Sequence, residues 1–269
     1  MSGATTPDAQ ALAALAAATA REVGKHLIRW RQARSSVASD TKSGPTDVVT
    51  AADHEAEGMI RERLLAAYPE AGWWGEESGR ACGSGSGLEW VVDPIDGTVN
   101  FLYDLPGWAV SVAAVWHGEV IGAAVMVPTT GTLFSASLGK GAWLDDESGR
   151  RQLHPSACSD LGQALIATGF AYDARVRSEQ GAAVGRLLGR VRDIRRAGAA
   201  AVDLCAVAAG RVDAFFERGL QPWDLAAGGF IAREAGAVVT ERPDGSVVAS
   251  GPLLAGPLEA LLADVNAWP

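Results

Sequence analysis

Apolar residues recur at helical spacing in the first quarter of the chain. An Ala- and Leu-rich segment predicts a first helix from about Thr6 to Arg31, with Thr-Pro-Asp supplying a cap and a first-turn proline. A second helix is predicted from Asp53 to Tyr68, because apolar residues return every three or four positions until Pro69. The polar segment Ser35 to Asp47 predicts a loop or short hairpin between them.

The middle of the chain changes to strand patterning. The Gly- and Ser-rich segment Gly79 to Gly87 predicts a flexible loop before an apolar strand. From Trp108 to Leu144 consecutive strands are expected, with turns at His117-Gly118 and Thr130-Gly131. Beyond about Asp146 to Arg151 strands and helices alternate, which predicts two subdomains, 1–148 and 149–269. The alternating elements are expected at 164–168, 178–188, 192–196, 199–211, 212–217 and 223–236.

Composition and charge narrow the class of protein. The chain has 269 residues, is 48% hydrophobic and carries a formal net charge of -9, which is globular and disfavours nucleic acid or an anionic membrane as a partner. A small phosphorylated substrate stays open, because bound cations can reverse the local field. Cys82, Cys158 and Cys205 lie far apart and indicate reduced thiols in a cytoplasmic protein. No apolar run is long enough to span a bilayer.

Acidic residues gather at the predicted ends of strands and helices. Carboxylates in such places lose solvation and repel each other, so they need a positive partner, and oxygen ligands of this kind suit Mg²⁺ or Mn²⁺. The alternatives are local: Asp53 and Asp224 could cap helices, and "DPIDG" could be a plain turn. The acidic positions are Asp53, Glu76 and Glu77 in "GEES", Asp93 and Asp96 in "DPIDGT", and Asp224 in "PWDLAAG".

Three motifs in this order, "GEES", "WVVDPIDGTVNF" and "PWDLAAG", resemble the signatures of the inositol monophosphatase family. Members of that family are magnesium-dependent, lithium-sensitive sugar phosphatases. "TDVVTAAD", "GKGAWL" and "RRAGAAAVDLCAVAAGRVDAFFE" support the resemblance, which covers the chain from about Lys42 to Ala235. The resemblance implies an α/β layered sandwich of alternating α-β-α-β-α layers, with two subdomains and the metal site between them.

The same resemblance implies how the acidic residues share two or three Mg²⁺ ions, for which Mn²⁺ is a possible substitute. Glu76, Asp93 and the Ile95 carbonyl would hold the first ion. Asp93, Asp96 and Asp224 would hold a second, and a third would lie near Glu76. Asp53 and Thr98 would then position and help deprotonate the attacking water, with Glu76 counted among the catalytic residues.

Phosphate and substrate contacts follow from the same comparison. The N–H groups of Gly97 and Thr98 would receive the phosphate, and the absence of a Cβ at Gly97 lets the backbone approach an anion. Glu217 would accept a hydrogen bond from a substrate hydroxyl, with Asp96, Asp224 and the Ala200 backbone nearby. Ala199 stands where family members often carry Ser or Thr.

The expected reaction is Mg²⁺-dependent hydrolysis of a small phosphorylated polyol or sugar, with inositol 1-phosphate as first choice and a homodimer as the expected assembly. Histidinol-phosphatase, fructose-1,6-bisphosphatase and 3'(2'),5'-bisphosphate nucleotidase activities stay open, because the metal machinery is shared. An aspartyl-phosphate mechanism of the haloacid-dehalogenase type fits poorly, since Asp93-x-x-Asp96 is one residue too long for its Asp-x-Asp motif. A non-catalytic regulatory protein that binds metal or ligand is the alternative from another class.

Overall fold

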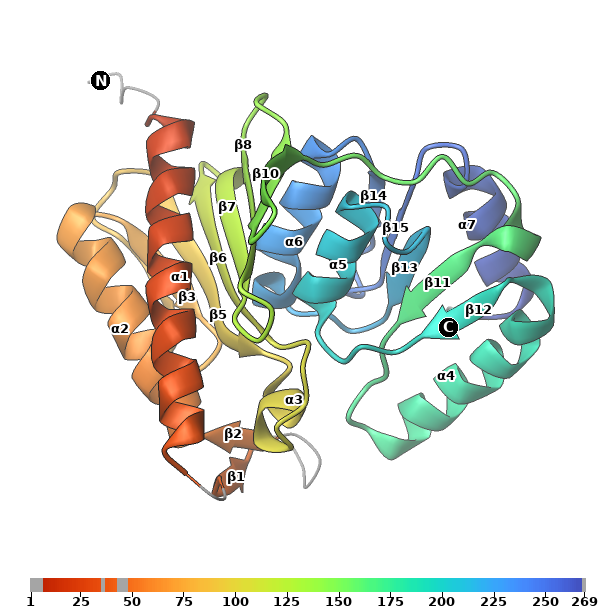
Figure 1. The fold of residues 1–269 in the computed structure, drawn as a ribbon, viewed down its shortest axis with the longest axis horizontal. Coiled ribbons are helices and arrows are strands. Elements are labelled where there is room, and N and C mark those ends of the chain that lie inside the picture. The colour runs from red at the N-terminus through yellow and green to blue at the C-terminus, as the bar shows by residue number, and fades with distance from the viewer. Residues whose placement is uncertain (1–6, 35–36, 43–47, 268–269) are drawn as a thin grey trace.

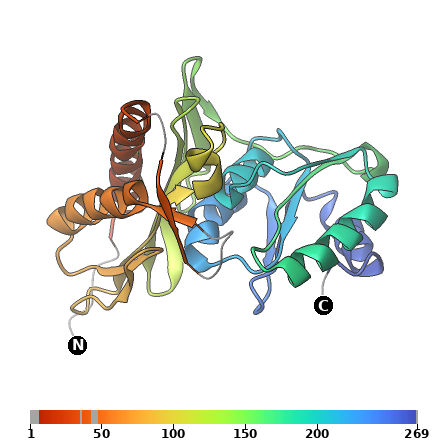
Figure 2. The same cartoon turned by 90° about the horizontal axis from the view of Figure 1, so that it is seen from below.

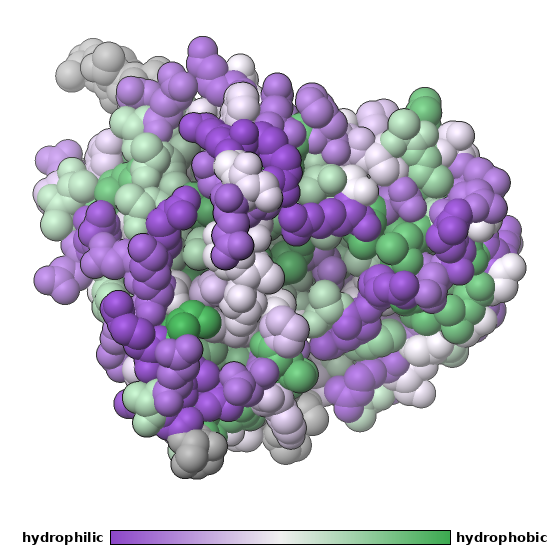
Figure 3. All heavy atoms as spheres, in the orientation of Figure 1, coloured by the Kyte–Doolittle hydropathy of each residue, from purple (hydrophilic) through white to green (hydrophobic). Residues whose placement is uncertain are grey.

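Five layers of secondary structure alternate between helices and sheets, in the order α-β-α-β-α (Figure 1). The computed structural model describes residues 7–34, 37–42 and 48–267. The layered sandwich is therefore the architecture that the motifs implied. Polar side chains cover much of the face seen in Figure 3, with smaller apolar areas between them. In the described part of the chain, no helix has the length and apolar character needed to cross a membrane.

The first layer consists of α1 (Ala9–Gln32) and α2 (Ala51–Ala67). Asp8 caps α1 by accepting from the N–H groups of Gln10 and Ala11, so this helix starts later than predicted; the expected cap, Thr6, lies outside the described residues. The second helix starts two residues before the predicted Asp53, because Thr50 is its N-cap. Both helices cover one face of the larger sheet (Figure 1).

The larger sheet has eight strands, and its consecutive antiparallel strands confirm the predicted succession between Trp108 and Leu144. The two-residue turn His117-Gly118 has positive φ at both positions, as tight hairpins require. One prediction was wrong: part of the expected flexible loop, Gly79–Ala81, forms a strand beside β3. In spatial order the strands are β10 (Gly149–Gln152), β9 (Ala142–Asp146), β8 (Thr132–Ser137), β7 (Glu119–Val127), β6 (Ala109–Trp116), β5 (Leu88–Asp96), β3 (Gly72–Gly75) and β4 (Gly79–Ala81).

Two smaller elements lie near the end of β5, where the acidic motif "DPIDGT" is found. The hairpin β1 (Ser39–Thr41) and β2 (Val48–Thr50) precedes α2, within and just after the segment expected to be a loop or hairpin. The short helix α3 (Thr98–Leu102) follows β5 directly. Part of that hairpin prediction, residues 35–36 and 43–47, lies outside the described residues.

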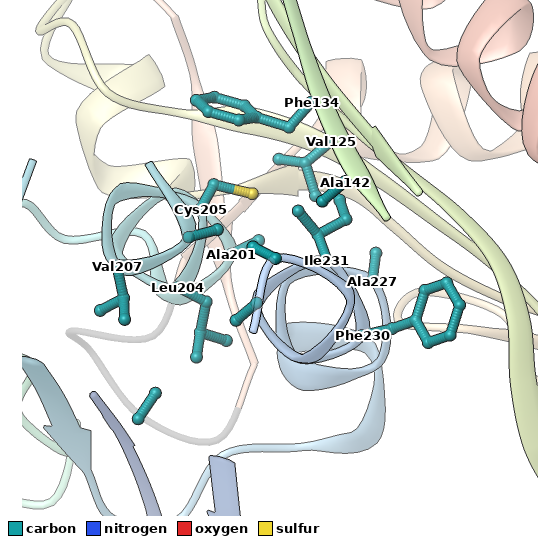
Figure 4. Close-up of a cluster of buried hydrophobic side chains, with 14 of the residues drawn as sticks. Val125, Phe134, Ala142, Ala201, Leu204, Cys205, Val207, Ala227, Phe230 and Ile231 are labelled. Carbon is teal, nitrogen blue, oxygen red and sulfur yellow. The ribbon is translucent and has the colours of Figure 1, made fainter. Parts of the chain in front are cut away.

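The central layer is formed by α5 (Ala200–Ala208) and α6 (Pro222–Glu234), which lie between the two sheets (Figures 1 and 2). Their apolar side chains form one core with the larger sheet, including Leu204 and Cys205 from α5 and Phe230 and Ile231 from α6 (Figure 4). Because these helices are buried on both sides, they are apolar nearly all round. An acidic residue in them is therefore expensive unless it faces a polar site.

The second sheet is mixed, with β11 parallel to β12 and β13, and β15 antiparallel to β13 and β14. Its far face is covered by α4 and α7 (Figure 1). The third helix expected from the pattern, at 178–188, begins four residues early, because Asp173 caps it. The elements are β11 (Leu165–Thr168), α4 (Ala174–Leu187), β12 (Asp193–Arg195), β13 (Ala214–Glu217), β14 (Val238–Glu241), β15 (Val247–Ser250), α7 (Ala255–Asp264) and two 3₁₀ turns (Leu161–Gln163, Leu188–Arg190).

The chain passes from one sheet to the other between β10 and β11. Strand β10 still pairs with β9, so residues 149–152 belong to the larger sheet although they follow the predicted boundary at 148. Helices α5 and α6, from the second half, pack against strands of the first half. The division into subdomains at 148 stays a prediction.

Candidate functional site

Three aspartates from two distant segments meet at one end of the larger sheet. Asp93 and Asp96 lie at the end of β5, and Asp224 lies in the first turn of α6. One carboxylate oxygen from each lies within 4.8 Å of the others. Asp93 and Asp96 are only 2% and 7% exposed. This is a buried concentration of negative charge, which a folded protein sustains only with protons or cations.

The end of β5 is shaped by its own sequence. Register with β6 shifts between Asp93 and Asp96, so the strand bends there, and Pro94 has no N–H to give to the ladder. The N–H of Ile95 donates to Asp93 at 2.9 Å. Gly97 then takes a φ of +91°, which turns the chain into α3. A Cβ at Gly97 would lie 3.1 Å from that of Ala199, so a side chain is disfavoured twice.

Asp53 is both a helix cap and part of the site. Its Oδ2 accepts from the Thr50 N–H at 2.8 Å and from the Thr50 hydroxyl at 2.6 Å, which completes a capping box at the start of α2. Its Oδ1 accepts from the Thr98 hydroxyl at 3.3 Å. Thr98 also lies 3.1 Å from the Ile95 carbonyl oxygen. The capping interpretation and the site interpretation of Asp53 are therefore compatible.

Asp224 takes part in a similar capping box at the start of α6. Its Oδ2 accepts from the N–H of Gln221 at 2.7 Å in a second capping box. Asp96 is held by the first turn of α5, where the Ala201 N–H donates to its Oδ2 at 2.7 Å. The two buried helices of the central layer thus bring their N-terminal turns to the end of β5.

Glu76 lies beside this group without joining the three-aspartate cluster. It follows β3, and its N–H donates to the Val92 carbonyl at 3.1 Å. Its carboxylate accepts from the ammonium of Lys42 at 2.6 Å, and Glu77 accepts from the same ammonium at 2.7 Å. The sequence analysis gave Lys42 no role. Its only signal was its place in the stretch before "TDVVTAAD".

Burial and mutual repulsion raise the pKa values of the clustered acids. Burial, and then the charge of Glu76, raises the pKa of Asp93 well above its ordinary value. Burial raises the pKa of Asp96 to about 7, although the Ala201 N–H opposes the change. Burial and the charge of Asp96 raise the pKa of Asp224. Acids that hold protons near neutral pH are sites where a divalent cation can replace those protons.

A pocket of about 510 Å³ opens over the cluster. Among its lining residues are all the predicted metal ligands, Gly97, Thr98, Ala200 and Glu217. A larger cavity, of about 960 Å³, is lined by Trp74, Leu225 and other residues of β5, β7 and α6. It contains none of the predicted site residues. Chemistry therefore selects the smaller pocket, since carboxylates converge only there among the described residues.

The substrate end of the pocket is acidic as well. Burial raises the pKa of Glu217 to about 8, and the charge of Asp224 adds to it. The Glu217 carboxylate lies against Gly169, where a Cβ would come within 2.0 Å of its Oε2. Arg196 lines the pocket too, and its charge lowers the pKa of Glu217. Glu217 therefore lines the pocket in which it is predicted to accept a hydrogen bond from a substrate hydroxyl.

Three further residues at this site were missed by the sequence analysis. Asp203, in the first turn of α5, is 4% exposed, and burial raises its pKa to about 8. An acid within an apolar helix was the signal. The Asn100 amide donates to the carbonyls of Gly107 and Ala197, both at 2.9 Å, which ties α3 to the segment before α5. Glu57 accepts two backbone N–H groups next to Glu76.

The donor set fits hard divalent cations. Carboxylate oxygens and a backbone carbonyl are the ligands that Mg²⁺ and Mn²⁺ take, and softer nitrogen or sulfur donors are not part of the predicted set. Three aspartates and Glu76 line the pocket, and the Lys42 ammonium is hydrogen-bonded to Glu76 and to Glu77. Arg196 and Arg218 are the other basic side chains in the pocket lining. None of these basic groups has a hydrogen bond to one of the three clustered aspartates among the described contacts, so a doubly charged ion could balance the charge of the cluster. Asp93, Asp96 and Asp224 could hold an ion between them.

The chain is similar to known proteins over most of its length. The family model described as "Inositol monophosphatase family" matches residues 8–267. The chain is 44% identical over 235 residues to "Inositol-1-monophosphatase" of Mycobacterium bovis, covering 84% of this chain and 81% of that protein. It is 39% identical over 257 residues to "Nus factor SuhB" of Escherichia coli, covering 94% of each. The solved structure "Mycobacterium tuberculosis SuhB" superposes with a TM-score of 0.86 at 38% identity, over 97% of this chain and 99% of that one.

Proposed function

Because this chain belongs to the inositol monophosphatase family and is a phosphatase, we propose that it hydrolyses a small phosphate monoester with the help of Mg²⁺, inositol 1-phosphate being the substrate that we favour. The single observation that carries the proposal is the convergence of Asp93, Asp96 and Asp224 beside the hydrogen-bonded pair Asp53–Thr98. The three aspartates and Thr98 line one pocket, and Asp53 is hydrogen-bonded to Thr98. A charged cluster and a polar pair are the two parts that phosphate ester hydrolysis needs.

Each part has its own task in the proposed reaction. Bound Mg²⁺ would supply positive charge for the phosphate oxygens and lower the pKa of the attacking water. Asp93, Asp96, Asp224, Glu76 and the Ile95 carbonyl would hold the ions. All of these ligands except Glu76 lie on β5 or α6, and Glu76 lies in the turn after β3. Ligands on regular elements keep their spacing better than ligands on loops.

The attacking water would be oriented by the Thr98 hydroxyl. That hydroxyl has two acceptors for its one proton, Asp53 and the Ile95 carbonyl, so its oxygen lone pairs are left to accept a hydrogen bond from water. Asp53 is fully buried and bound to Thr50, which fixes its orientation. The proton that water loses would pass through Thr98 toward Asp53, whose pKa burial raises. The N–H groups of Gly97 and Thr98 would bind the phosphate.

Substrate choice would depend on the opposite wall of the pocket. Glu217 would accept hydrogen bonds from the hydroxyl groups of a polyol, beside Asp96, Asp224 and the backbone of Ala200. A carboxylate suits vicinal hydroxyls, because its two oxygens can accept from both. Histidinol phosphate, fructose 1,6-bisphosphate and adenosine 3',5'-bisphosphate stay open as substrates of the same machinery.

Assembly and location belong to the same proposal. We expect a homodimer, and exposed apolar side chains such as Tyr103 and Leu105, at 70% and 50% exposure, offer surface for one. We also expect a cytoplasmic protein, which is consistent with three free cysteines.

Phosphate release decides whether this proposal holds. The purified, chelator-treated chain should release phosphate from inositol 1-phosphate only after Mg²⁺ or Mn²⁺ is added. A panel of monoesters, compared by kcat/KM, should rank the polyol phosphate first. Failure to release phosphate from any monoester at any Mg²⁺ concentration would refute the proposal.

A regulatory role is a second candidate, favoured by the name "Nus factor SuhB" that two related chains from Escherichia coli and Vibrio cholerae carry. Such a role would not require catalysis. A chain that binds Mg²⁺ but hydrolyses nothing in the panel would support it.

A further inference from the structure

Glu57 is a buried acid that the proposed reaction does not use. It lies on α2, four residues after Asp53, so both side chains project from the same face of the helix. Its side chain is 4% exposed. Burial of a carboxylate beside other acids costs free energy, so contacts must compensate for it.

Those contacts are to the turn that carries Glu76. Residues 76–78 connect β3 to β4, and Glu76 is the first of them. The two oxygens of Glu57 accept one N–H each, from Glu77 at 2.8 Å and from Ser78 at 3.0 Å. Hydrogen bonds from backbone N–H to a charged acceptor are among the stronger ones in proteins. Glu57 therefore fixes the orientation of the peptide units that follow Glu76.

The residues before the turn also contact this arrangement. A Cβ at Gly75 would lie 2.6 Å from the Glu57 carboxyl carbon and from its Oε1. The Trp73 indole donates to the Ser78 hydroxyl at 2.9 Å. The turn is therefore held from α2 by Glu57 and from β3 by Trp73.

We propose that Glu57 is a positioning residue, which holds the Glu76 turn so that Glu76 can bind Mg²⁺ together with Asp93. Helix α2 also carries Asp53, which accepts a hydrogen bond from Thr98 on α3. One helix face thus sets the distance between the groups that orient water and a group that holds an ion. The inference rests on the proposed function, because it takes Glu76 as a metal ligand.

Two substitutions separate positioning from folding. Glu57→Gln keeps the size but leaves one N–H facing an amide NH₂, and Glu57→Asp keeps the charge but withdraws it by one methylene. Each should weaken Mg²⁺ binding about ten-fold or more in calorimetry, the usual effect of removing a group that orients a metal ligand. Glu55→Gln is the matched control, because Glu55 lies on the same helix but contacts Trp30 and His26 on α1. It should bind Mg²⁺ as the unchanged chain does.

Activity provides the second readout. In the Glu57 variants the Mg²⁺ concentration at half-maximal activity should rise with the dissociation constant, and kcat should recover when Mg²⁺ saturates. Loss that no Mg²⁺ concentration reverses, or unchanged Mg²⁺ binding in both folded variants, would overturn the proposal. If neither variant folds, hydrogen exchange of the unchanged chain decides: Mg²⁺ should slow exchange at the amides of Glu77 and Ser78, and no slowing refutes the role.

The outcomes also separate this inference from the proposed function. If the unchanged chain takes up no Mg²⁺, the proposed function fails, and the role of Glu57 toward a metal fails with it. If the unchanged chain takes up Mg²⁺ and both Glu57 variants do so equally well, the proposed function stands and only the positioning role is refuted.

Discussion

Replacement of Asp93 by Asn tests the electrostatics of the site most directly. The amide has nearly the shape of the carboxyl group, and its oxygen can still accept from the Ile95 N–H. It cannot carry the charge that two ions would share. We therefore expect phosphate release to be abolished while the fold is retained.

The same change should stabilise the chain when no metal is present. Two unit charges 4.8 Å apart, the separation limit of the cluster, repel by about 3 kcal/mol at an effective dielectric constant of about 20. Protons relieve part of this repulsion, because the pKa values of the clustered acids are raised. At pH 8 we expect about 2 kcal/mol to remain, which corresponds to about 4–8 °C in Tm for a chain of this size.

The dependence on pH follows from the sign of the pKa changes. A carboxyl group whose pKa is higher in the folded chain favours folding while it is protonated. That contribution is full below its unfolded pKa, near 3.8 for Asp, and is lost as the pH rises through its folded pKa, about 7 for Asp96. The advantage of the Asp93→Asn variant should therefore be small at pH 5 and largest near pH 8.

Added Mg²⁺ should reverse the order of stability. A ligand at one hundred times its dissociation constant stabilises the folded state by about 2.7 kcal/mol, and only the chain with Asp93 would gain fully. The assay is thermal unfolding of both chains in EDTA and in Mg²⁺, at pH 5 and pH 8. If Asp93→Asn proved less stable than the unchanged chain in EDTA at pH 8, the reasoning about buried repulsion would be wrong.

Three further predictions concern the other parts of the site. Thr98→Ala should lower kcat by at least about a hundred-fold and leave Mg²⁺ binding unchanged, because only the orientation of water is lost. Kinetics and calorimetry check this, and a near-normal kcat would exclude the hydroxyl from the reaction. Glu217→Gln should reduce kcat/KM for inositol 1-phosphate more than for an aryl phosphate, whereas equal reductions would remove Glu217 from substrate choice. In EDTA the Tm of the unchanged chain should fall as the pH rises from about 5 to 8, because Glu217 and Asp203 both have pKa values near 8 and must ionise while buried; a flat profile would contradict this.

Local patterns predicted the elements well where the chemistry was local. The strand that ends in Asp93 and Asp96, and the turn at Gly97, could be read from a few adjacent residues. The strand at Gly79–Ala81 was taken for a flexible loop, because its pairing with β3 is a tertiary effect that Gly and Ser content does not reveal. The last two strands and α7 were not predicted, although Asp244-Gly245 marked a turn between the strands.

The site, too, contains residues that the sequence indicated and residues that it did not. Glu76 and Asp224 belong to other segments than the β5 aspartates. Their places at the ends of predicted elements suggested that they could converge with Asp93 and Asp96, and the resemblance to a known family implied that they share metal ions. Lys42 and Glu57 had no such motif, and each contacts the turn at Glu76 only in the folded arrangement. Residues that support a site through backbone groups leave little trace in a single sequence.

Asp53, Asp93, Asp96 and Asp224 are held in the same way. In Asp53, Asp93, Asp96 and Asp224, one oxygen accepts a backbone N–H. The donors are Thr50, Ile95, Ala201 and Gln221. One such bond offsets part of the cost of burying each acid, and the second oxygen of Asp53 accepts from Thr98. The fold can therefore form before any ion binds, and the remaining repulsion favours the ion when it arrives.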